Sequence, residues 1–275
     1  MADLLIKNDS FPSSKENFLD EILLNKRKEV ALKKQIFEGK NWENFPFFAR
    51  NCFSLKQNLL HYSIGIIAEF KRKSPSKGWI HADAHVEEIT SGYNAEGAAG
   101  ISILTDTDFF GGSADDVTTV RNQISCPILR KDFVVDEFQI YEAKAIGADV
   151  VLLIATALTI PEVKNFAHLA HQLGLEVLLE VHNKEELSYL NEYVDVVGVN
   201  NRNLKTFKVD TGISADLAGY IPPEFVKISE SGISNIETVK ELNQLGYRGF
   251  LMGENFMKET YPVLALKEFL KQLNA

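Results

Sequence analysis

The chain has 275 residues, of which 45% are hydrophobic and 24% are charged, and its formal net charge is -9. These values are typical of a globular protein and argue against a disordered or membrane-embedded chain, and the length suits one large domain. Nucleic-acid binding needs a basic surface that neutralises phosphates, so 38 acidic against 29 basic residues disfavour a general nucleic-acid partner.

Residues 1–63 are predicted to be an N-terminal helical extension of a single domain that spans residues 1–275. In "SSKENFLDEILLNKRKEVALKKQ" basic residues lie opposite an apolar helical stripe, which holds Phe18, Leu19, Ile22 and Leu23. We expect this helix to pack on the rest of the chain with its charged face in solvent. "MADLLIKNDS" lacks the apolar stretch of a secretory signal, and no run approaches the length of a membrane span, so a cytoplasmic location is expected.

From residue 64 onward, short β-branched runs alternate with longer amphipathic runs, the pattern of parallel strands joined by crossover helices. The predicted strands are Ile64 to Phe70, Gly100 to Leu104, Ile128 to Lys131, Val150 to Ile154, Glu176 to Glu180, Val196 to Asn200, Phe225 to Ser229 and Gly249 to Met252. The predicted helical stretches between them include "VDEFQIYEAKAIG", "IPEVKNFAHLAHQLG", "NKEELSYLNEY" and "SNIETVKELNQLG". Eight such units predict an α/β fold, a closed (β/α)8 TIM barrel, with a doubly wound open sheet as the alternative.

Polar residues close most of the predicted strands, and the carboxyl ends of barrel strands are where active sites lie. The strand-end residues are Glu69, Lys71, Lys131, Glu180, Asn200, Glu230, Ser231 and Gly253. Any one of them can be explained as a salt bridge in a loop, but six such ends predict a shared cavity. Because an unpaired ion beside apolar residues is costly, we expect the two lysines to pair with these glutamates or with a bound anion.

Two loops have the composition of a phosphate site. The loops "SESGIS" and "LMGENF" follow the seventh and eighth strands, where many barrels bind a phosphate on backbone N–H groups. Gly232 and Gly253 would let the main chain approach closely, and Ser74 adds a hydroxyl from the first loop. For Glu254 we expect the backbone N–H to face the phosphate and the carboxylate to turn away.

The remaining candidates indicate a small ligand. The cations Lys71, Lys131 and Arg202 follow different strands, which favours a compact anion with a second negative group over a polymer. Phe110 and Phe133 are predicted to form an aromatic wall at the cavity mouth, although packing within the loops explains them equally well.

The cysteines and histidines indicate no metal chemistry. Cys52 and Cys126 lack metal or CxxC spacing and are expected to be free thiols. The six histidines form no HExxH pattern, so we expect them to have surface or core roles. No Ser/His/Asp order indicates nucleophilic catalysis.

Seven motifs, in order, resemble those of the indole-3-glycerol phosphate synthase family, the tryptophan-pathway barrel enzymes. They are "IIAEFKRKSPSKG", "ISILTDTDFFGGS", "PILRKDFVVDEFQI", "GADVVLLIA", "LGLEVLLEVHN", "VGVNNRNLKTFKVD" and "KISESGI". The resemblance runs from "EILLNKRKEV" to the final helix. It implies ring closure of 1-(2-carboxyphenylamino)-1-deoxyribulose 5-phosphate with loss of carbon dioxide and water, without a cofactor. We separately expect a monomer.

The resemblance also implies roles for single residues. Lys131 is similar to the general acid of the family, Lys71 to the residue that holds the substrate carboxylate, and Glu180 to the second acid/base. The implied supporting residues are Glu69 and Asn200 for orientation, Arg202 and Glu230 for binding, and Ser74, Ser231, Gly232 and Gly253 for the phosphate. Phe70 and Asn203 depart from the usual pattern, where a smaller aliphatic residue and an aspartate are common, and this affects only the expected pocket packing. The alternatives are another sugar-phosphate barrel enzyme, such as phosphoribosylanthranilate isomerase, and a non-catalytic barrel that binds a phosphorylated ligand.

Overall fold

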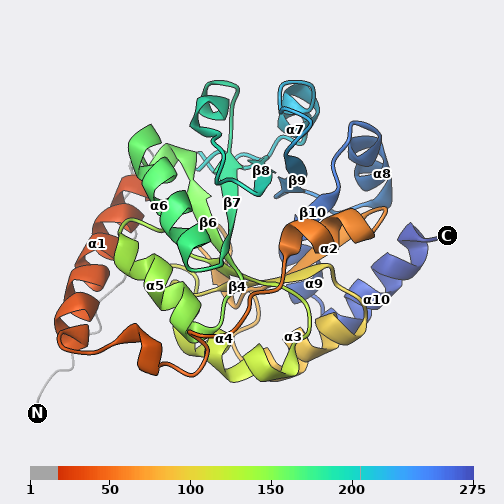
Figure 1. Ribbon diagram of the computed structural model, residues 1–275. Helices are drawn as coiled ribbons and strands as arrows, with labels where there is room; N and C mark the ends of the chain where they lie inside the picture. The colour runs from red at the N-terminus through yellow and green to blue at the C-terminus, as the bar shows by residue number, and fades with distance from the viewer. Residues whose placement is uncertain (1–17, 205) are drawn as a thin grey trace, which may run out of the picture.

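The computed structural model describes residues 18–204 and 206–275, so the first 17 residues of the predicted extension lie outside the described part. Within that part, eight parallel strands close into a barrel in the order β1, β10, β9, β8, β7, β6, β5, β4 (Figure 1). They are β1 (Gly65–Phe70), β4 (Gly100–Leu104), β5 (Ile128–Lys131), β6 (Val150–Ile154), β7 (Glu176–Val181), β8 (Val196–Asn200), β9 (Val226–Glu230) and β10 (Gly249–Met252). Each lies within one residue of its predicted range. Since β1 pairs with both β10 and β4, the predicted barrel is confirmed and the open sheet is excluded.

Helices surround the barrel and connect its strands (Figure 1). The longer ones after β1 are α3 (Val86–Ala95), α4 (Ala114–Val120), α5 (Glu137–Ile146), α6 (Ile160–Gln172), α7 (Gly212–Leu217), α8 (Ile236–Gln244) and α10 (Pro262–Leu273). The shorter pieces are α9 (Glu254–Met257) and the 3-10 turns η2 (Trp42–Asn44), η3 (Arg121–Gln123), η4 (Ala155–Ala157) and η5 (Glu185–Tyr189). A hairpin of β2 (Lys73–Ser74) and β3 (Gly78–Trp79) follows β1.

One predicted helix, "NKEELSYLNEY", was wrong, because only η5 forms in this segment. The side chain of Asn191 bonds the backbone on both sides: its Oδ1 accepts from the N–H of Tyr193 at 3.0 Å, and its Nδ2 donates to the carbonyl of Tyr189 at 3.1 Å. Such local side-chain bonds compete with helix formation and end the turn.

The barrel interior is filled by apolar side chains of alternate strand residues, among them Ile67, Leu152 and Leu178. Helix α2 (Leu55–His61) closes the end where the strands begin. Its Leu59 fits there because two strands start with glycine: a Cβ on Gly65 or Gly249 would lie only 2.8 or 2.7 Å from a Leu59 methyl carbon. The filled interior leaves the opposite end of the barrel for the polar strand-end residues.

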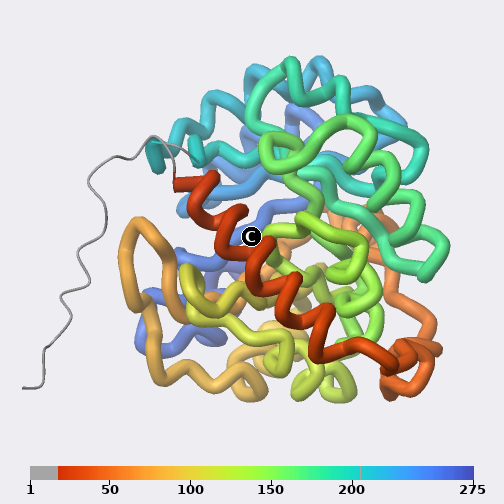
Figure 2. Tube along the Cα trace, turned by 90° about the vertical axis from the view of Figure 1, so that its left-hand side faces the viewer, coloured from red at the N-terminus to blue at the C-terminus, as the bar shows by residue number. Residues whose placement is uncertain are grey.

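Helix α1 (Phe18–Phe37) runs along the outside of the barrel beside α5 (Figures 1 and 2). Leu19 and Ile22 belong to the interior core. The prediction that the basic residues of this helix face solvent was wrong for Lys26, which is 0% exposed. Of the helices that the structure describes, none is long and apolar enough to span a bilayer.

Candidate active site

A cavity of about 500 Å³ opens at the carboxyl ends of the strands. It is lined by all the predicted site residues: Glu69, Lys71, Ser74, Phe110, Lys131, Phe133, Glu180, Asn200, Arg202, Glu230, Ser231, Gly232, Gly253 and Glu254. These residues are widely separated in the chain and meet because parallel strands end at the same face of a barrel. A cavity of this volume suits one small molecule.

Lys131 lies at the centre of the ionic groups in this cavity. Its Nζ lies 3.2 Å from Glu180 Oε2 and makes a close ion pair with Glu230 Oε2. Glycine at position 198 on β8 makes room for Glu230, since a Cβ there would lie 2.2 Å from Glu230 Oε1. Strands β5, β7 and β9 thus each place one charged side chain in the same small volume.

Two carboxylates compete for the ammonium of Lys131. Burial alone would lower the pKa of Lys131, but the charges of Glu230 and Glu180 outweigh it and raise that pKa, so the lysine is a firmly held cation. Burial raises the pKa of Glu230 to about 7; Lys131 opposes this rise, and the negative charge of Glu180 adds to it. For Glu180 burial is outweighed by Lys131 and His182, and its pKa falls below the ordinary value. Of the two coupled carboxylates, Glu180 therefore has the lowered pKa and Glu230 the raised one.

A second ion pair lies beside this group. Lys71 Nζ donates to Glu69 Oε1 at 2.5 Å, the pairing expected for two residues that share one strand face. Asn200 Nδ2 donates to Glu180 Oε1 at 2.9 Å, and Asn200 Oδ1 accepts from the backbone N–H of Arg202 at 2.9 Å. Asn200 thereby fixes both Glu180 and the start of the loop that carries Arg202.

The predicted phosphate loops meet at one side of the cavity. Ser231 and Gly232 both have positive φ, 66° and 74°, so two successive residues turn the chain at the end of β9. Ser74 Oγ is buried and has no hydrogen-bond partner among the described residues, which leaves it available to a ligand. Gly253 is required by packing, because a Cβ there would lie 2.5 Å from Glu69 Oε1.

Glu254 lies beside two cations of this region. Its carboxylate, which we expected to turn away, has Oε1 3.7 Å from Lys77 Nζ and Oε2 4.0 Å from Arg202 Nη2. All three residues line the cavity. The Glu254 carboxylate thus stands beside cations that an anionic ligand would also approach.

The apolar wall of the cavity comes partly from an unexpected element. Phe110 and Phe133 both line the cavity, and their ring centroids lie 6.0 Å apart. Phe18, Leu19 and Ile22 of α1 complete the lining. The sequence indicated these three residues only as the packing face of a helix, so their place at the site was missed.

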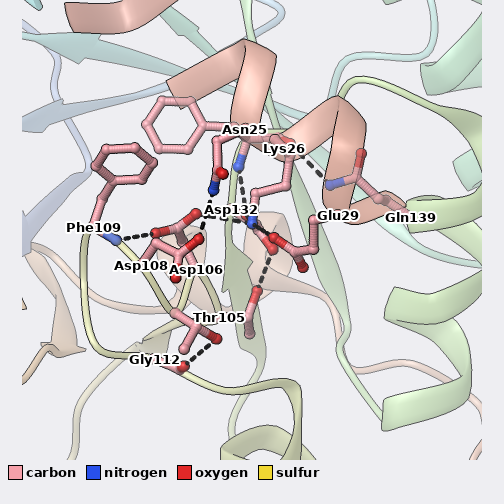
Figure 3. Close-up of polar contacts among 12 residues, drawn as sticks. Asn25, Lys26, Glu29, Thr105, Asp106, Asp108, Phe109, Gly112, Asp132 and Gln139 are labelled. Atoms are coloured by element: carbon pink, nitrogen blue, oxygen red, sulfur yellow. Dashed lines mark hydrogen bonds and ion pairs between the residues drawn. The ribbon is translucent and has the colours of Figure 1, made fainter. Parts of the chain in front are cut away.

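A buried ionic cluster attaches α1 to the loops that carry the site (Figure 3). Lys26 Nζ lies 2.7 Å from Glu29 Oε2, 2.9 Å from Asp106 Oδ2 and 3.0 Å from Asp132 Oδ1. Asp106 follows β4, and Asp132 is the residue after Lys131. One side chain of α1 thereby joins the ends of two neighbouring strands. The charges of Asp132 and Asp106 outweigh burial and raise the pKa of Lys26.

The burial of Lys26 could have been recognised from the spacing of the buried residues in α1. Leu19, Ile22, Lys26 and Val30 are the buried residues of the helix, and their spacing is that of one helical face. A cation inside an apolar stripe is therefore a signal for buried carboxylate partners.

Among the described residues, no group of three or more His, Cys, Asp and Glu side chains has the arrangement of a metal site.

Comparisons with known proteins agree with the geometry. The family model described as "Indole-3-glycerol phosphate synthase" matches residues 19–269. A protein of that name from Bacteroides thetaiotaomicron is 50% identical over 258 residues, covering 94% of this chain and 99% of the relative. One from Caldanaerobacter subterraneus is 42% identical over 256 residues, covering 93% and 98%.

The solved structures that resemble the chain support the fold alone, because their sequences are distant. The 3-hexulose-6-phosphate synthase of Salmonella typhimurium has a TM-score of 0.59 at 13% identity, covering 76% of this chain and 100% of its own. A chain of the Pyrococcus furiosus tryptophan synthase complex has a TM-score of 0.58 at 16% identity, covering 77% and 98%.

Proposed function

The chain belongs to the indole-3-glycerol phosphate synthase family, and we propose that Lys131 is the general acid and Glu180 the second acid/base of its reaction. The enzyme closes the indole ring of 1-(2-carboxyphenylamino)-1-deoxyribulose 5-phosphate in tryptophan biosynthesis, and carbon dioxide and water are lost. It is a carboxy-lyase that acts on a small phosphorylated substrate.

Ring closure needs a proton donor at the sugar carbonyl. As the ring carbon attacks this carbonyl, negative charge develops on its oxygen, and the Lys131 ammonium donates a proton to it. Glu180 and Glu230 hold the Nζ of Lys131 from two sides, which supports this role because a donor must be fixed in position to act. A positioned acid contributes about 10² to 10⁴-fold to the rate.

Loss of carbon dioxide and water follows ring closure. Lys71 holds the substrate carboxylate until the carbon–carbon bond breaks, and Glu69 orients this lysine through the 2.5 Å contact. Glu180 balances charge on the anilino nitrogen and assists the departure of water. The depressed pKa of Glu180, caused by Lys131 and His182 against the effect of burial, supplies the ionised form that this role requires. Asn200 keeps the Glu180 carboxylate aligned with the sugar hydroxyls.

The two ends of the substrate bind at different walls of the cavity. The phosphate binds Ser74 and the backbone of Ser231, Gly232 and Gly253, with Arg202 as a nearby cation. The anthranilate ring packs on Phe110 and Phe133, beside the apolar side chains of α1. Glu230 supports Lys131, and the Glu254 backbone faces the phosphate. The hydroxyl of Ser74, which has no hydrogen-bond partner in the described part of the chain, supports this orientation of the substrate.

The observation that carries these roles is the convergence of Lys71, Lys131 and Glu180 on one cavity. The test is formation of indoleglycerol phosphate, followed by absorbance or fluorescence, with purified protein and no added metal. Phosphoribosylanthranilate is the comparison substrate, and turnover of it in place of the carboxyphenylamino substrate would contradict the assignment.

We also propose a monomeric, cytoplasmic enzyme without a cofactor, in which residues 1–275 form one domain. Support for one domain comes from Leu19 and Ile22, which belong to the barrel core, and from Lys26, which is bonded to two strand ends. Size-exclusion chromatography with light scattering tests the monomer, and a dimeric mass would contradict it.

A further inference from the structure

An imidazole lies between Glu180 and a second carboxylate, and it approaches the Glu180 oxygen that Lys131 does not contact. His182 follows β7, two residues after Glu180, and its side chain is 11% exposed. Its Nε2 lies 3.3 Å from Glu180 Oε1, and its Nδ1 lies 3.2 Å from Glu186 Oε2. Nε2 forms no aligned hydrogen bond within the described residues, so the ion pair with Glu180 is what compensates for its burial.

The outer carboxylate is itself held in place. Glu186 lies on η5, and its Oε1 accepts from Thr156 Oγ1 at 2.7 Å and from Asn183 Nδ2 at 2.8 Å. Its Oε2 accepts from the backbone N–H of His182 at 2.8 Å. Burial would raise the pKa of Glu186, but the bonds from His182 and Thr156 outweigh it and lower that pKa. Glu186 is therefore an ionised, fixed acceptor behind the imidazole.

A histidine with a carboxylate facing each ring nitrogen carries both protons, because only the imidazolium presents a positively polarised N–H to both carboxylates. Burial would lower the pKa of His182, but Glu180 and Glu186 raise it to about 10. His182 thus supplies a second permanent positive charge beside the carboxylates of the cavity.

This second charge changes the balance around Glu180. The charged groups facing the imidazole are Glu180 on β7 and Glu186 on η5, and beyond Glu180 lies Lys131 on β5, which also contacts Glu230 on β9. With Lys131 alone, one ammonium would have to balance two buried carboxylates. The imidazolium lets Glu180 stay ionised even while Lys131 gives up its proton to the substrate.

We propose that His182 is a positioning residue of the reaction, a doubly protonated imidazole that is braced by Glu186 and holds Glu180 ionised and aligned. The inference rests on the proposed role of Glu180. It assigns a function to a histidine for which the sequence indicated only a surface or core role.

The variant that tests the proposal is His182→Gln, which keeps an N–H donor and removes the charge. We expect kcat to fall about 10 to 10²-fold, the effect of a displaced catalytic group, with KM unchanged. The acidic limb of the kcat profile, which reports ionisation of Glu180 in the substrate complex, should move to higher pH because a neighbouring cation is lost. Unchanged kcat and an unchanged profile, even with a lower melting temperature, would overturn the proposal.

The matched control is His171→Gln. His171 Nε2 also pairs with a carboxylate, Asp195 Oδ2 at 2.8 Å, but Asp195 does not line the cavity, whereas Glu180, the partner of His182, does. We expect wild-type kinetics in this variant. An equal shift of its pH profile would show a general charge effect and overturn the specific role of His182.

Two further measurements keep the proposal falsifiable if His182→Gln does not fold. Glu186→Gln removes the negative charge beside His182 Nδ1, so the pKa of His182 should fall. The basic limb of the kcat profile should therefore move to lower pH than in the wild type. Nuclear magnetic resonance of the wild-type imidazole at about pH 8 should show both ring nitrogens protonated, given a pKa of about 10. A singly protonated ring would overturn the proposal.

Glu180→Gln separates this inference from the proposed function. If Glu180→Gln loses turnover while His182→Gln and Glu186→Gln behave as wild type, only the inference fails. If Glu180→Gln retains turnover, the acid/base role of Glu180 fails and the inference falls with it.

Discussion

Two lysines of this protein, the buried Lys26 and the half-buried Lys131, both lie among carboxylates but differ in how many carboxylates they contact. Lys26 has three carboxylates within 3.0 Å, which matches the three donors of an ammonium group. Lys131 has two, from Glu180 and Glu230, and lines the cavity. Lys26 is absent from the described lining of that cavity. An ammonium with one carboxylate for each N–H stabilises the fold, whereas Lys131, which has only two carboxylate contacts and lines the cavity, can also contact a ligand.

The largest effect should come from Lys131→Ala. Removing the proton donor should reduce kcat about 10² to 10⁴-fold, measured as the rate of indoleglycerol phosphate formation. Circular dichroism should show a folded protein, because the two carboxylates that remain can share a proton. Turnover close to the wild-type value would refute the catalytic role of Lys131.

Lys26→Met should instead reduce the free energy of unfolding, by about 3 to 5 kcal/mol, because it leaves buried carboxylates without their cation. Urea titration measures this change. The matched control on the same helix is Lys34→Met, whose partner Asp136 lies at 3.0 Å on the surface, and it should lose at most about 1 kcal/mol. If Lys26→Met kept its free energy of unfolding but lost turnover, Lys26 would have a catalytic role like Lys131. The distinction between a structural and a catalytic lysine would then be wrong.

Acid should weaken the Lys26 cluster within a defined pH range. Arg130 and Lys26 outweigh burial and lower the pKa of Asp132 from 3.8 to about 2. The folded pKa is depressed, so this stabilisation is present above pH 3.8 and is lost as the pH falls through about 2. The loss should be roughly 2 kcal/mol and should be missing in Asp132→Asn. The prediction would be contradicted if the free energy of unfolding changed with pH by the same slope in the wild type and in Asp132→Asn.

The smallest effect concerns the unused hydroxyl at the cavity. Ser74→Ala removes one hydrogen bond to a charged phosphate, worth about 1.5 kcal/mol at the lower end, so KM should rise roughly tenfold with kcat unchanged. Ser91→Ala, at an exposed serine of α3, should leave both constants unchanged. An unaltered KM in Ser74→Ala would place the phosphate elsewhere.

The strands and the strand-end residues could be predicted because both follow from local patterns. Short β-branched runs indicate the strands, and the barrel rule brings residues as distant as Lys71 and Glu230 to the same face. The place of Lys26 was missed because a charged residue in a helix normally lies in solvent, and its two distant partners are visible only in the fold. His182 was missed for a similar reason: its role depends on Glu186, whose position is set by a turn that the sequence predicted as a helix.

The link between α1 and the strand ends has a consequence for the order of folding. Lys26 precedes its partners Asp106 and Asp132 by 80 and 106 positions in the chain, so its ion pairs close long loops and their closure entropy must be overcome first. We expect α1 to dock after β4 and β5 have paired. The wall formed by Phe18, Leu19 and Ile22 would then join the cavity only after β4 and β5 are in place, and full substrate affinity would appear only after α1 has docked during refolding.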